Sequence, residues 1–160
     1  MLIGVMADSH DNVPKVEAAV SLFNRAQVKH VLHAGDFVAP FAIDPLRGLH
    51  CPVLSVFGNN DGERLGLAAR IREVGEVHPY LATISLADRQ IAVVHYPELA
   101  EPLAKSGAYD LVVYGHTHRV DQRHDHGLVL NPGEVGGWLT GCSTVAVVDL
   151  STLQVQLHEL

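Results

Sequence analysis

The amino-acid sequence predicts an α/β protein in which helices cover the outside of β-sheet. Two observations support this fold class. The first half of the chain alternates short apolar runs, typical of buried strands, with stretches of helical periodicity. The second half contains mainly pairs of strands joined by turns. This order of elements predicts two packed sheets, or one mixed sheet, with the helices on the outside.

Three apolar runs in the first half of the chain predict strands. They cover residues 2–7, 30–34 and 52–57. Each run is followed by a polar residue, either directly or after one glycine. Runs of this length without a polar interruption are typical of strands that are covered on both faces. We therefore expect these three strands in the interior of a sheet.

Helices are predicted between and after these strands. Asn12 is a candidate N-cap, and Pro14 lies in the first turn of the helix that follows. Residues 41–49 are interrupted by proline and glycine, so they leave room for only a short helix. Residues 63–74 have helical periodicity and predict a further helix.

The second half of the chain begins with a predicted hairpin. Its strands, residues 81–86 and 90–94, flank a turn at Asp88–Arg89. A helix is expected over residues 98–106, closed by Gly107. The remaining predicted elements are strands at 111–114, 144–150 and 153–160, and an exposed turn between strands at His124, Asp125 and His126. Because the chain shows no repeat or linker, we expect one domain over residues 1–160.

Composition restricts the classes of function. Of the 160 residues, 48% are apolar and 18% are charged, which is typical of a compact globular protein. The net charge of -7 argues against strong binding of nucleic acid, which requires a basic surface. A small phosphorylated substrate remains compatible with this charge, because bound metal cations reverse the sign of the local field.

The cysteines and the N-terminus predict a cytoplasmic protein. Cys51 and Cys142 form no CxxC pair, so neither a disulfide framework nor a thiolate zinc site is expected. The apolar N-terminal run lacks a basic leader and ends at Asp8, which favours a buried strand over a signal peptide. No apolar run approaches the ~20 residues that span a bilayer, so no membrane association is expected.

Residues able to bind metal follow the predicted strands. The carboxyl ends of strands in an open α/β sheet share one edge, where ligands usually bind. Five predicted strands end close to such a residue, and two histidines follow two positions later. The seven candidates are Asp8, His10, Asp36, Asn59, His95, His116 and His118.

The chemistry of these seven side chains indicates a dinuclear metal site. Carboxylate, amide and imidazole ligands without thiolate suit Mn, Fe, Zn or similar ions. Seven groups exceed what one tetrahedral centre requires. If one carboxylate bridges, they suffice for two ions about 3.5–4 Å apart, the arrangement that supports in-line phosphoryl displacement.

The ordered motifs resemble those of the calcineurin-like metallophosphoesterases. The residues that carry the resemblance are Asp8-Ser9-His10, Gly35-Asp36, Gly58-Asn59-Asn60-Asp61, His95, Gly115-His116-Thr117-His118 and Asn131-Pro132-Gly133. The small bacterial and archaeal phosphodiesterase branch is the most similar, and that branch also resembles the vacuolar-sorting subunit of retromer. The resemblance implies a four-layer fold: two mixed β-sheets packed as a sandwich, flanked by helices, with the metals at the carboxyl edge of the strands.

The resemblance also implies a role for each candidate ligand. Asp36 would bridge two divalent metals, of which Mn is expected, with Fe, Zn or Ni as alternatives. One metal would be held by Asp8, His10, Asp36 and His118, and the other by Asp36, Asn59, His95 and His116. A hydroxide between the metals would attack phosphorus while both ions neutralise the developing charge.

Two positions depart from the family pattern. Many family members have a histidine where this chain has Asn60, and Asn can contact a phosphate oxygen but is not a useful acid at neutral pH. The family commonly continues after His95 with Gly-His, whereas this chain has Tyr96 and Pro97. Tyr96 and Arg119 are expected to contact substrate, and Trp138 is interpreted as a packing or interface residue.

The resulting hypothesis is a metal-dependent phosphoesterase, specifically a phosphodiesterase that hydrolyses a small phosphorylated substrate. The missing acid at Asn60 favours diesters or activated leaving groups. The first alternative is a catalytically silent metal-binding module for protein interaction, with the same fold. The second is a mononuclear metal hydrolase of another substrate class. Homo-oligomer formation is left open by the sequence.

Overall fold

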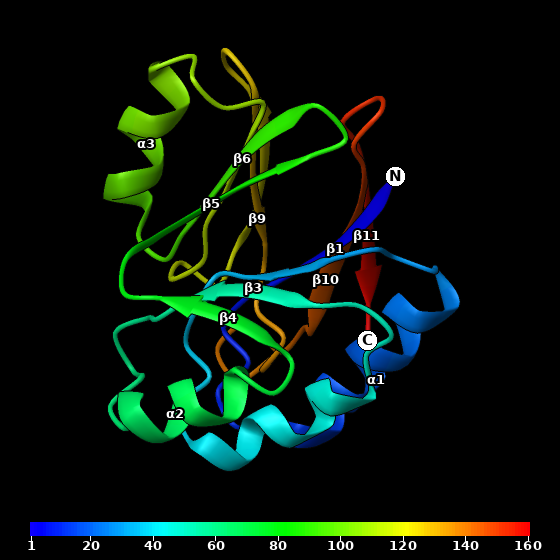
Figure 1. The fold of residues 1–160 in the computed structure, drawn as a ribbon, viewed down its shortest axis with the longest axis vertical. Coiled ribbons are helices and arrows are strands. Elements are labelled where there is room, and N and C mark those ends of the chain that lie inside the picture. The colour runs from blue at the N-terminus through cyan, green and yellow to red at the C-terminus, as the bar shows by residue number, and fades with distance from the viewer.

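The fold is described from a computed structural model that covers residues 1–160. Two β-sheets pack face to face, and helices cover their outer faces (Figure 1). This arrangement of helix, sheet, sheet and helix confirms the predicted four-layer α/β architecture. In Figure 1 the strands β3 and β4 run toward the left-hand side of the molecule, so the carboxyl edge of their sheet faces left.

The first sheet has six strands in the order β11-β10-β1-β2-β3-β4. Its strands are β1 (Leu2–Met6), β2 (Val31–His33), β3 (Val53–Val56), β4 (Gly75–His78), β10 (Thr144–Asp149) and β11 (Gln154–Glu159). The four strands β1 to β4 are parallel, and β10 and β11 extend the sheet in antiparallel fashion. The carboxyl ends of β1, β2 and β3 therefore meet at one edge.

The second sheet has five strands in the order β5-β6-β7-β9-β8. Its strands are β5 (Leu81–Leu86), β6 (Arg89–Val94), β7 (Leu111–Val113), β8 (Val120–His124) and β9 (Leu128–Pro132). The central strands β6, β7 and β9 are parallel, whereas β5 and β8 pair antiparallel at the two edges. The two sheets are thus both mixed, as predicted.

Four helical segments flank the sheets, and three apolar layers hold the structure together. The helical segments are α1 (Val13–Arg25), the 3-10 helix η1 (Pro40–Gly48), α2 (Arg64–Ile71) and α3 (Pro97–Lys105). The middle layer joins the two sheets through residues such as Val5, Leu32 and Ile91. One outer layer joins the first sheet to α1, η1 and α2, and the other lies beneath α3.

The structure corrects the predicted helix at residues 63–74. Helix α2 ends at Ile71, and β4 follows from Gly75, a strand that the sequence pattern did not predict. Gly75 pairs with Val53, and a Cβ atom on Gly75 would lie 1.8 Å from Val53 O. The strand therefore begins where only glycine fits against β3.

Two local expectations are also corrected. The β5–β6 turn lies at Ala87–Asp88, whose φ angles are 49° and 62°, and Arg89 already pairs with Leu86. Asn12 occupies the N-cap position of α1, but its side chain does not cap the helix. Its amide instead donates a hydrogen bond to Gly136 O at 2.7 Å. No helix in the structure has the length and apolar character required to cross a membrane.

We expect Gly75→Ala to destabilise the fold by about 2–4 kcal/mol, because the new methyl group overlaps the carbonyl of Val53. Urea unfolding followed by circular dichroism measures the loss. Gly62→Ala is the matched control, since a Cβ atom at Gly62 meets nothing within 4 Å. Equal unfolding midpoints for the two variants would contradict the packing argument.

Candidate metal centre

The loop after β1 brings Asp8 and His10 to the edge of the sheet. Their φ angles are 52° and 42°, in the left-handed region that non-glycine residues rarely adopt. Backbone hydrogen bonds from Asp8 N to Gly35 O (3.0 Å) and from His10 N to Asp36 O (3.1 Å) hold this conformation. The loop after β1 is therefore fixed against the loop after β2.

Asp61 joins the loop after β2 to the loop after β3. Its buried carboxylate accepts hydrogen bonds from the backbone N–H groups of Asp36 (3.0 Å), Val38 (2.8 Å) and Gly58 (2.7 Å). The carboxylate of Asp36 accepts two hydrogen bonds from Asn60, one from the backbone and one from the side-chain amide, both at 2.8 Å. Asp36 is thus fixed in position between neighbouring loops.

His95, His116 and Asn59 form one half of the candidate site. Nδ1 of His95 lies 2.7 Å from Ala34 O, and a carbonyl oxygen only accepts, so the proton of the neutral ring lies on Nδ1. The free electron pair on His95 Nε2 then faces Asn59 Oδ1 (2.9 Å) and Asp36 Oδ2 (3.6 Å). His116 Nδ1 approaches the same Asn59 oxygen at 2.8 Å.

His10 and His118 form the other half. Their rings are stacked, with centroids 4.9 Å apart. His10 Nε2 lies 3.5 Å from Asp36 Oδ2, and His118 Nε2 lies 3.8 Å from Asp8 Oδ1. His10 Nε2 is buried and has no hydrogen-bond partner. An unpartnered nitrogen that faces carboxylates fits a ligand position for a cation.

The electrostatics of the site also fit bound cations. Asp8 and Asp36 are almost completely buried, with exposed fractions of 0% and 1%. Burial, together with the negative charge of Asp36, raises the pKa of Asp8 to about 8. Burial lowers the pKa values of His10 and His95, which favours neutral rings with free electron pairs. Two acids with neutral imidazoles around them are the donor set that divalent metals require.

The structure brings all seven predicted residues to one place. Two groups have ligand atoms close enough to share an ion: Asp8 with His10 and His118, and Asp8 with Asp36 and His95. Asn59 and His116 join them through the hydrogen bonds given above. The assignment of each residue to one metal or the other stays a prediction.

The three further site residues differ in how the structure places them. Tyr96 packs edge-on against His95 and His116, with ring centroids 4.9 and 5.1 Å away. The Asn60 amide is bound to Asp36, as described. Arg119 is exposed, and its side chain forms no hydrogen bond or ion pair. Their contacts with substrate stay predictions.

Glu134 is a site residue that the sequence did not reveal. It is buried, and its Oε2 lies 2.9 Å from His118 Nδ1. Burial raises the pKa of Glu134, but hydrogen bonds from His118 and Thr140 outweigh this effect and hold the pKa below its usual value. A carboxylate on the far nitrogen of a histidine orients the ring and makes its other nitrogen a better metal ligand.

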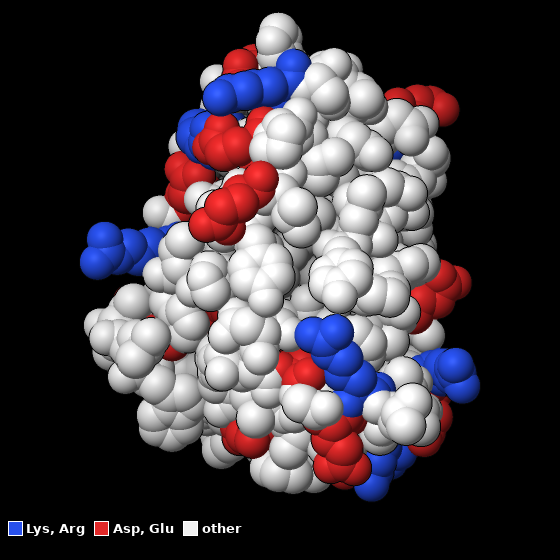
Figure 2. All heavy atoms as spheres, turned by 90° about the vertical axis from the view of Figure 1, so that its left-hand side faces the viewer, with Lys and Arg blue, Asp and Glu red and all other residues white.

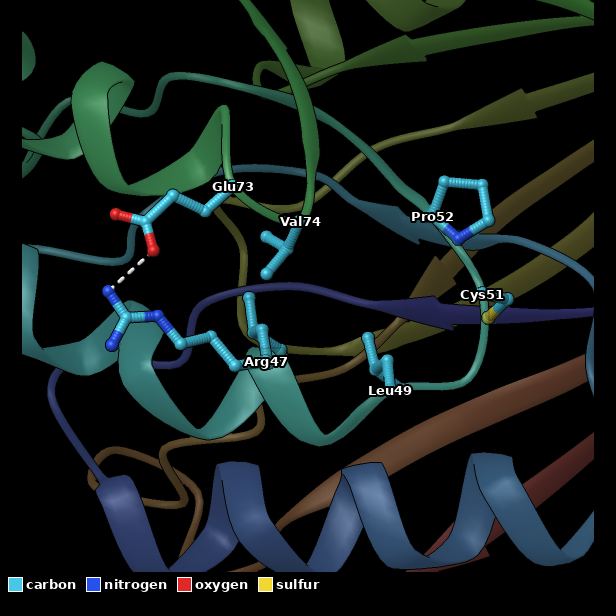
Figure 3. Close-up of a pocket in the computed structure, with 7 residues that line it drawn as sticks. Arg47, Leu49, Cys51, Pro52, Glu73 and Val74 are labelled. Atoms are coloured by element: carbon cyan, nitrogen blue, oxygen red, sulfur yellow. Dashed lines mark ion pairs between the residues drawn. The ribbon is translucent and has the colours of Figure 1, made fainter.

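The face that carries the candidate metal centre is separate from the pocket drawn in Figure 3. Figure 2 looks onto the carboxyl edge, where the middle of the face is largely free of Lys, Arg, Asp and Glu and charged side chains gather near α3 and α2. The pocket of Figure 3 lies at the opposite, amino end of β3, between Cys51, Pro52 and Val74. Arg47 and Glu73 form a 2.7 Å ion pair beside it. No cluster of metal-binding side chains lies there.

Comparisons with known proteins agree with this geometry. Residues 1–153 match the model of the calcineurin-like phosphoesterase superfamily domain. A phosphodiesterase of Methanocaldococcus jannaschii is 38% identical over 154 residues, which cover 93% of each chain. A solved structure of an archaeal phosphodiesterase superposes with a TM-score of 0.94, at 34% identity and with full coverage of both chains.

More distant solved structures share the fold. Vps29 of Chaetomium thermophilum has a TM-score of 0.72 at 17% identity, covering 100% of this chain and 95% of its own. The phosphoesterase Yfce of E. coli has a TM-score of 0.68 at 18% identity, covering 100% and 98%. At these identities the likeness concerns the arrangement of strands and helices alone.

Proposed function

Because the chain belongs to the calcineurin-like phosphoesterase superfamily and is therefore a metallophosphoesterase, we propose that it hydrolyses a phosphodiester bond in a small substrate. The observation that supports this proposal best is the buried position of Asp36 between two sets of imidazoles. Its Oδ2 lies 3.5 Å from His10 Nε2 and 3.6 Å from His95 Nε2. A carboxylate in this position is suited to bridging two cations.

In this proposal the seven candidate residues hold two divalent metal ions. The first is held by Asp8, His10, Asp36 and His118, and the second by Asp36, Asn59, His95 and His116. Mn is the proposed metal because the donor set is mixed N/O without thiolate, and Fe, Zn and Ni suit the same donors. When bound, two such ions lower the pKa of water and neutralise the charge that develops on the phosphoryl oxygens.

The residues of the chain position and orient these groups. Asp61 fixes the two loops that carry Asp36 and Asn59. Ala34 O and Glu134 each bind the Nδ1 of a histidine and thereby keep its Nε2 free. Tyr96 borders the site and is proposed to contact the substrate, as is Arg119, whose free guanidinium suits a phosphate or carboxylate.

Leaving-group chemistry determines the proposed substrate class. Asn60 occupies the position of an acid and donates its amide protons instead, so it does not protonate a departing alkoxide. Substrates whose leaving group is stable as an anion depend least on such an acid. We therefore propose diesters with activated leaving groups, and a contact between Asn60 and a phosphate oxygen.

The setting proposed for this activity is a single domain in the cytoplasm. Cys51 and Cys142 are both free thiols, which suits a reducing compartment.

The rival function, a catalytically silent interaction module, is supported only by the fold likeness to Vps29 at 17% identity. The phosphodiesterase relative at 38% identity favours the enzyme.

A metal-reconstitution assay tests the proposed function. The protein is stripped with a chelator and then titrated with Mn while hydrolysis of bis(p-nitrophenyl) phosphate is followed. We expect the rate to rise at least ~100-fold over the stripped protein, since charge neutralisation by the ions contributes several kcal/mol. The rate should reach its plateau at two equivalents of metal.

The same assay separates the alternatives. p-Nitrophenyl phosphate serves as the matched monoester and should be the poorer substrate. A plateau at one equivalent would support a mononuclear hydrolase instead. If none of Mn, Fe, Zn and Ni restores hydrolysis of either ester, the catalytic proposal is wrong and the interaction module is the better hypothesis.

A further inference from the structure

The loop after β9 presents the only tryptophan of the chain beside the candidate metal centre. Trp138 is 66% exposed, and the adjacent Leu139 is 76% exposed. Trp138 Nε1 donates a hydrogen bond to His10 O at 3.0 Å, so the indole lies at the rim of the site. Large aromatic side chains are usually buried, and their exposure at a rim marks a surface available to a ligand.

The loop that carries Trp138 is held rigidly by Glu134. The buried carboxylate of Glu134 accepts hydrogen bonds from the backbone N–H groups of Trp138 (3.1 Å), Leu139 (3.0 Å) and Thr140 (2.6 Å). The same carboxylate binds His118 Nδ1. Because one side chain anchors both the loop and a candidate metal ligand, the indole keeps a fixed position relative to the centre, and little ordering entropy is lost on binding.

The indole of Trp138 contacts the protein along the edge formed by Cδ1 and Nε1. A Cβ atom on Gly136 would lie 2.9 Å from Trp138 Cδ1 and 3.1 Å from Asp8 O, so Gly136 leaves the space that this edge occupies. Cδ1 and Nε1 both belong to the pyrrole ring, which therefore faces the protein. Because Trp138 is 66% exposed, a large part of its surface stays accessible to a flat group.

Aromatic rings lie at both ends of the candidate site. Tyr96 packs against His95 and His116 at one end. Trp138 lies beside His10 at the other end. A phosphodiester carries two organic groups on phosphorus, and this arrangement provides an aromatic surface for each of them.

We propose that Trp138 is a specificity-determining residue that stacks on a planar aromatic group, a nucleobase or an aryl ring, carried by the phosphate ester. This inference rests on the proposed function, since the phosphate is placed at the metal centre. Stacking of a base on an aromatic side chain increases affinity roughly 10- to 100-fold. Trp138 thus selects among phosphate esters without taking part in the chemical step.

Ligand binding to the manganese-loaded protein tests this inference independently of catalysis. Ribose 5-phosphate carries a hydroxyl group where adenosine 5′-monophosphate carries its base, and phenyl phosphate carries an aryl ring instead. Trp138 is the only tryptophan, so quenching of its fluorescence reports stacking directly. Isothermal titration calorimetry gives the affinities of all three compounds, including those that cause no quenching.

The expected results follow from the geometry. Adenosine 5′-monophosphate should quench the fluorescence and bind roughly 10- to 100-fold more tightly than ribose 5-phosphate. Trp138→Ala should remove this advantage and leave the affinity for ribose 5-phosphate within about twofold, because phosphate contacts do not involve the indole. Trp138→Phe should retain part of the tighter binding of adenosine 5′-monophosphate. Phenyl phosphate binding as tightly as the nucleotide would identify an aryl ring as sufficient, and weaker binding would identify a nucleobase.

Leu139→Ala is the matched control, since Leu139 is also exposed on the same loop but is not aromatic. It should leave all three affinities unchanged. The inference is overturned if Trp138→Ala weakens the binding of adenosine 5′-monophosphate and of ribose 5-phosphate equally. It is also overturned if Leu139→Ala has the same effect as Trp138→Ala. A change from oligomer to monomer on Trp138→Ala in sedimentation velocity would also overturn it, by identifying an interface residue. Absence of hydrolysis together with selective nucleotide binding would reject the proposed function and not the stacking.

Discussion

Asp36→Asn is expected to lower kcat/KM for bis(p-nitrophenyl) phosphate by at least about a thousandfold, because it removes the charge that we propose would stabilise two metal ions and, through them, the transition state. Asp36 Oδ2 is the carboxylate oxygen that lies within 3.6 Å of imidazoles from both halves of the site. Asn preserves the size of the side chain but removes the negative charge, together with one of the two acceptor oxygens that Asn60 contacts. The bound manganese should fall from two ions per chain to one or fewer, as measured by atomic emission after gel filtration.

Asp44→Asn provides the control for this substitution. Asp44 is an exposed aspartate on η1 that pairs with Arg47 and Arg70 and belongs to neither group of candidate metal ligands. It should leave activity and metal content unchanged. Circular dichroism and thermal unfolding of both metal-free variants should match the parent protein. An Asp36→Asn protein that keeps two metals and full activity would refute the proposed bridge.

Glu134→Ala is expected to weaken metal binding 10- to 100-fold, roughly the effect of removing a carboxylate that orients a ligating histidine. The variant leaves His118 Nδ1 without its partner and releases the backbone N–H groups of Trp138, Leu139 and Thr140. Competition with a chelating dye measures the metal affinity. The thermal unfolding temperature should also fall, because buried donors lose their acceptor.

Thr140→Val separates the two roles of Glu134. Thr140 Oγ1 donates to Glu134 Oε1 at 2.7 Å, on the side away from His118. Its replacement should lower the unfolding temperature slightly and leave metal affinity unchanged. If Glu134→Ala binds manganese as tightly as the parent protein, Glu134 supports only the loop and does not position His118.

The ligand cluster could be predicted because its position follows from strand direction. Asp8, Asp36 and Asn59 come after parallel neighbours in one sheet, and His95 and His116 come after parallel neighbours in the other. The carboxyl ends of parallel strands share an edge, so a linear pattern of strand ends suffices to locate the site. The apolar runs predicted buried strands with helices outside, in two packed sheets or one mixed sheet, and the resemblance to the calcineurin-like family implied the four layers.

Glu134 and β4 could not be predicted because both depend on contacts that are distant in the sequence. Glu134 lies beside His118 in a loop whose next residue, Val135, donates its backbone N–H to Ala7 O, more than 100 positions earlier in the chain. β4 follows a helical pattern with few residues between, and its start depends on the fit of Gly75 against Val53. Neither contact produces a periodic pattern of apolar residues in the sequence.

The backbone conformation of the candidate ligands opposes the stability of the fold. Five of them, Asp8, His10, Asp36, His116 and His118, have positive φ angles between 42° and 69°. Such conformations cost of order 1–3 kcal/mol each for non-glycine residues. Replacement of any of these residues by glycine would therefore relieve backbone strain but remove a candidate ligand. The candidate centre thus holds five strained residues at once, and a chain that replaced them would gain stability as it lost its ligands.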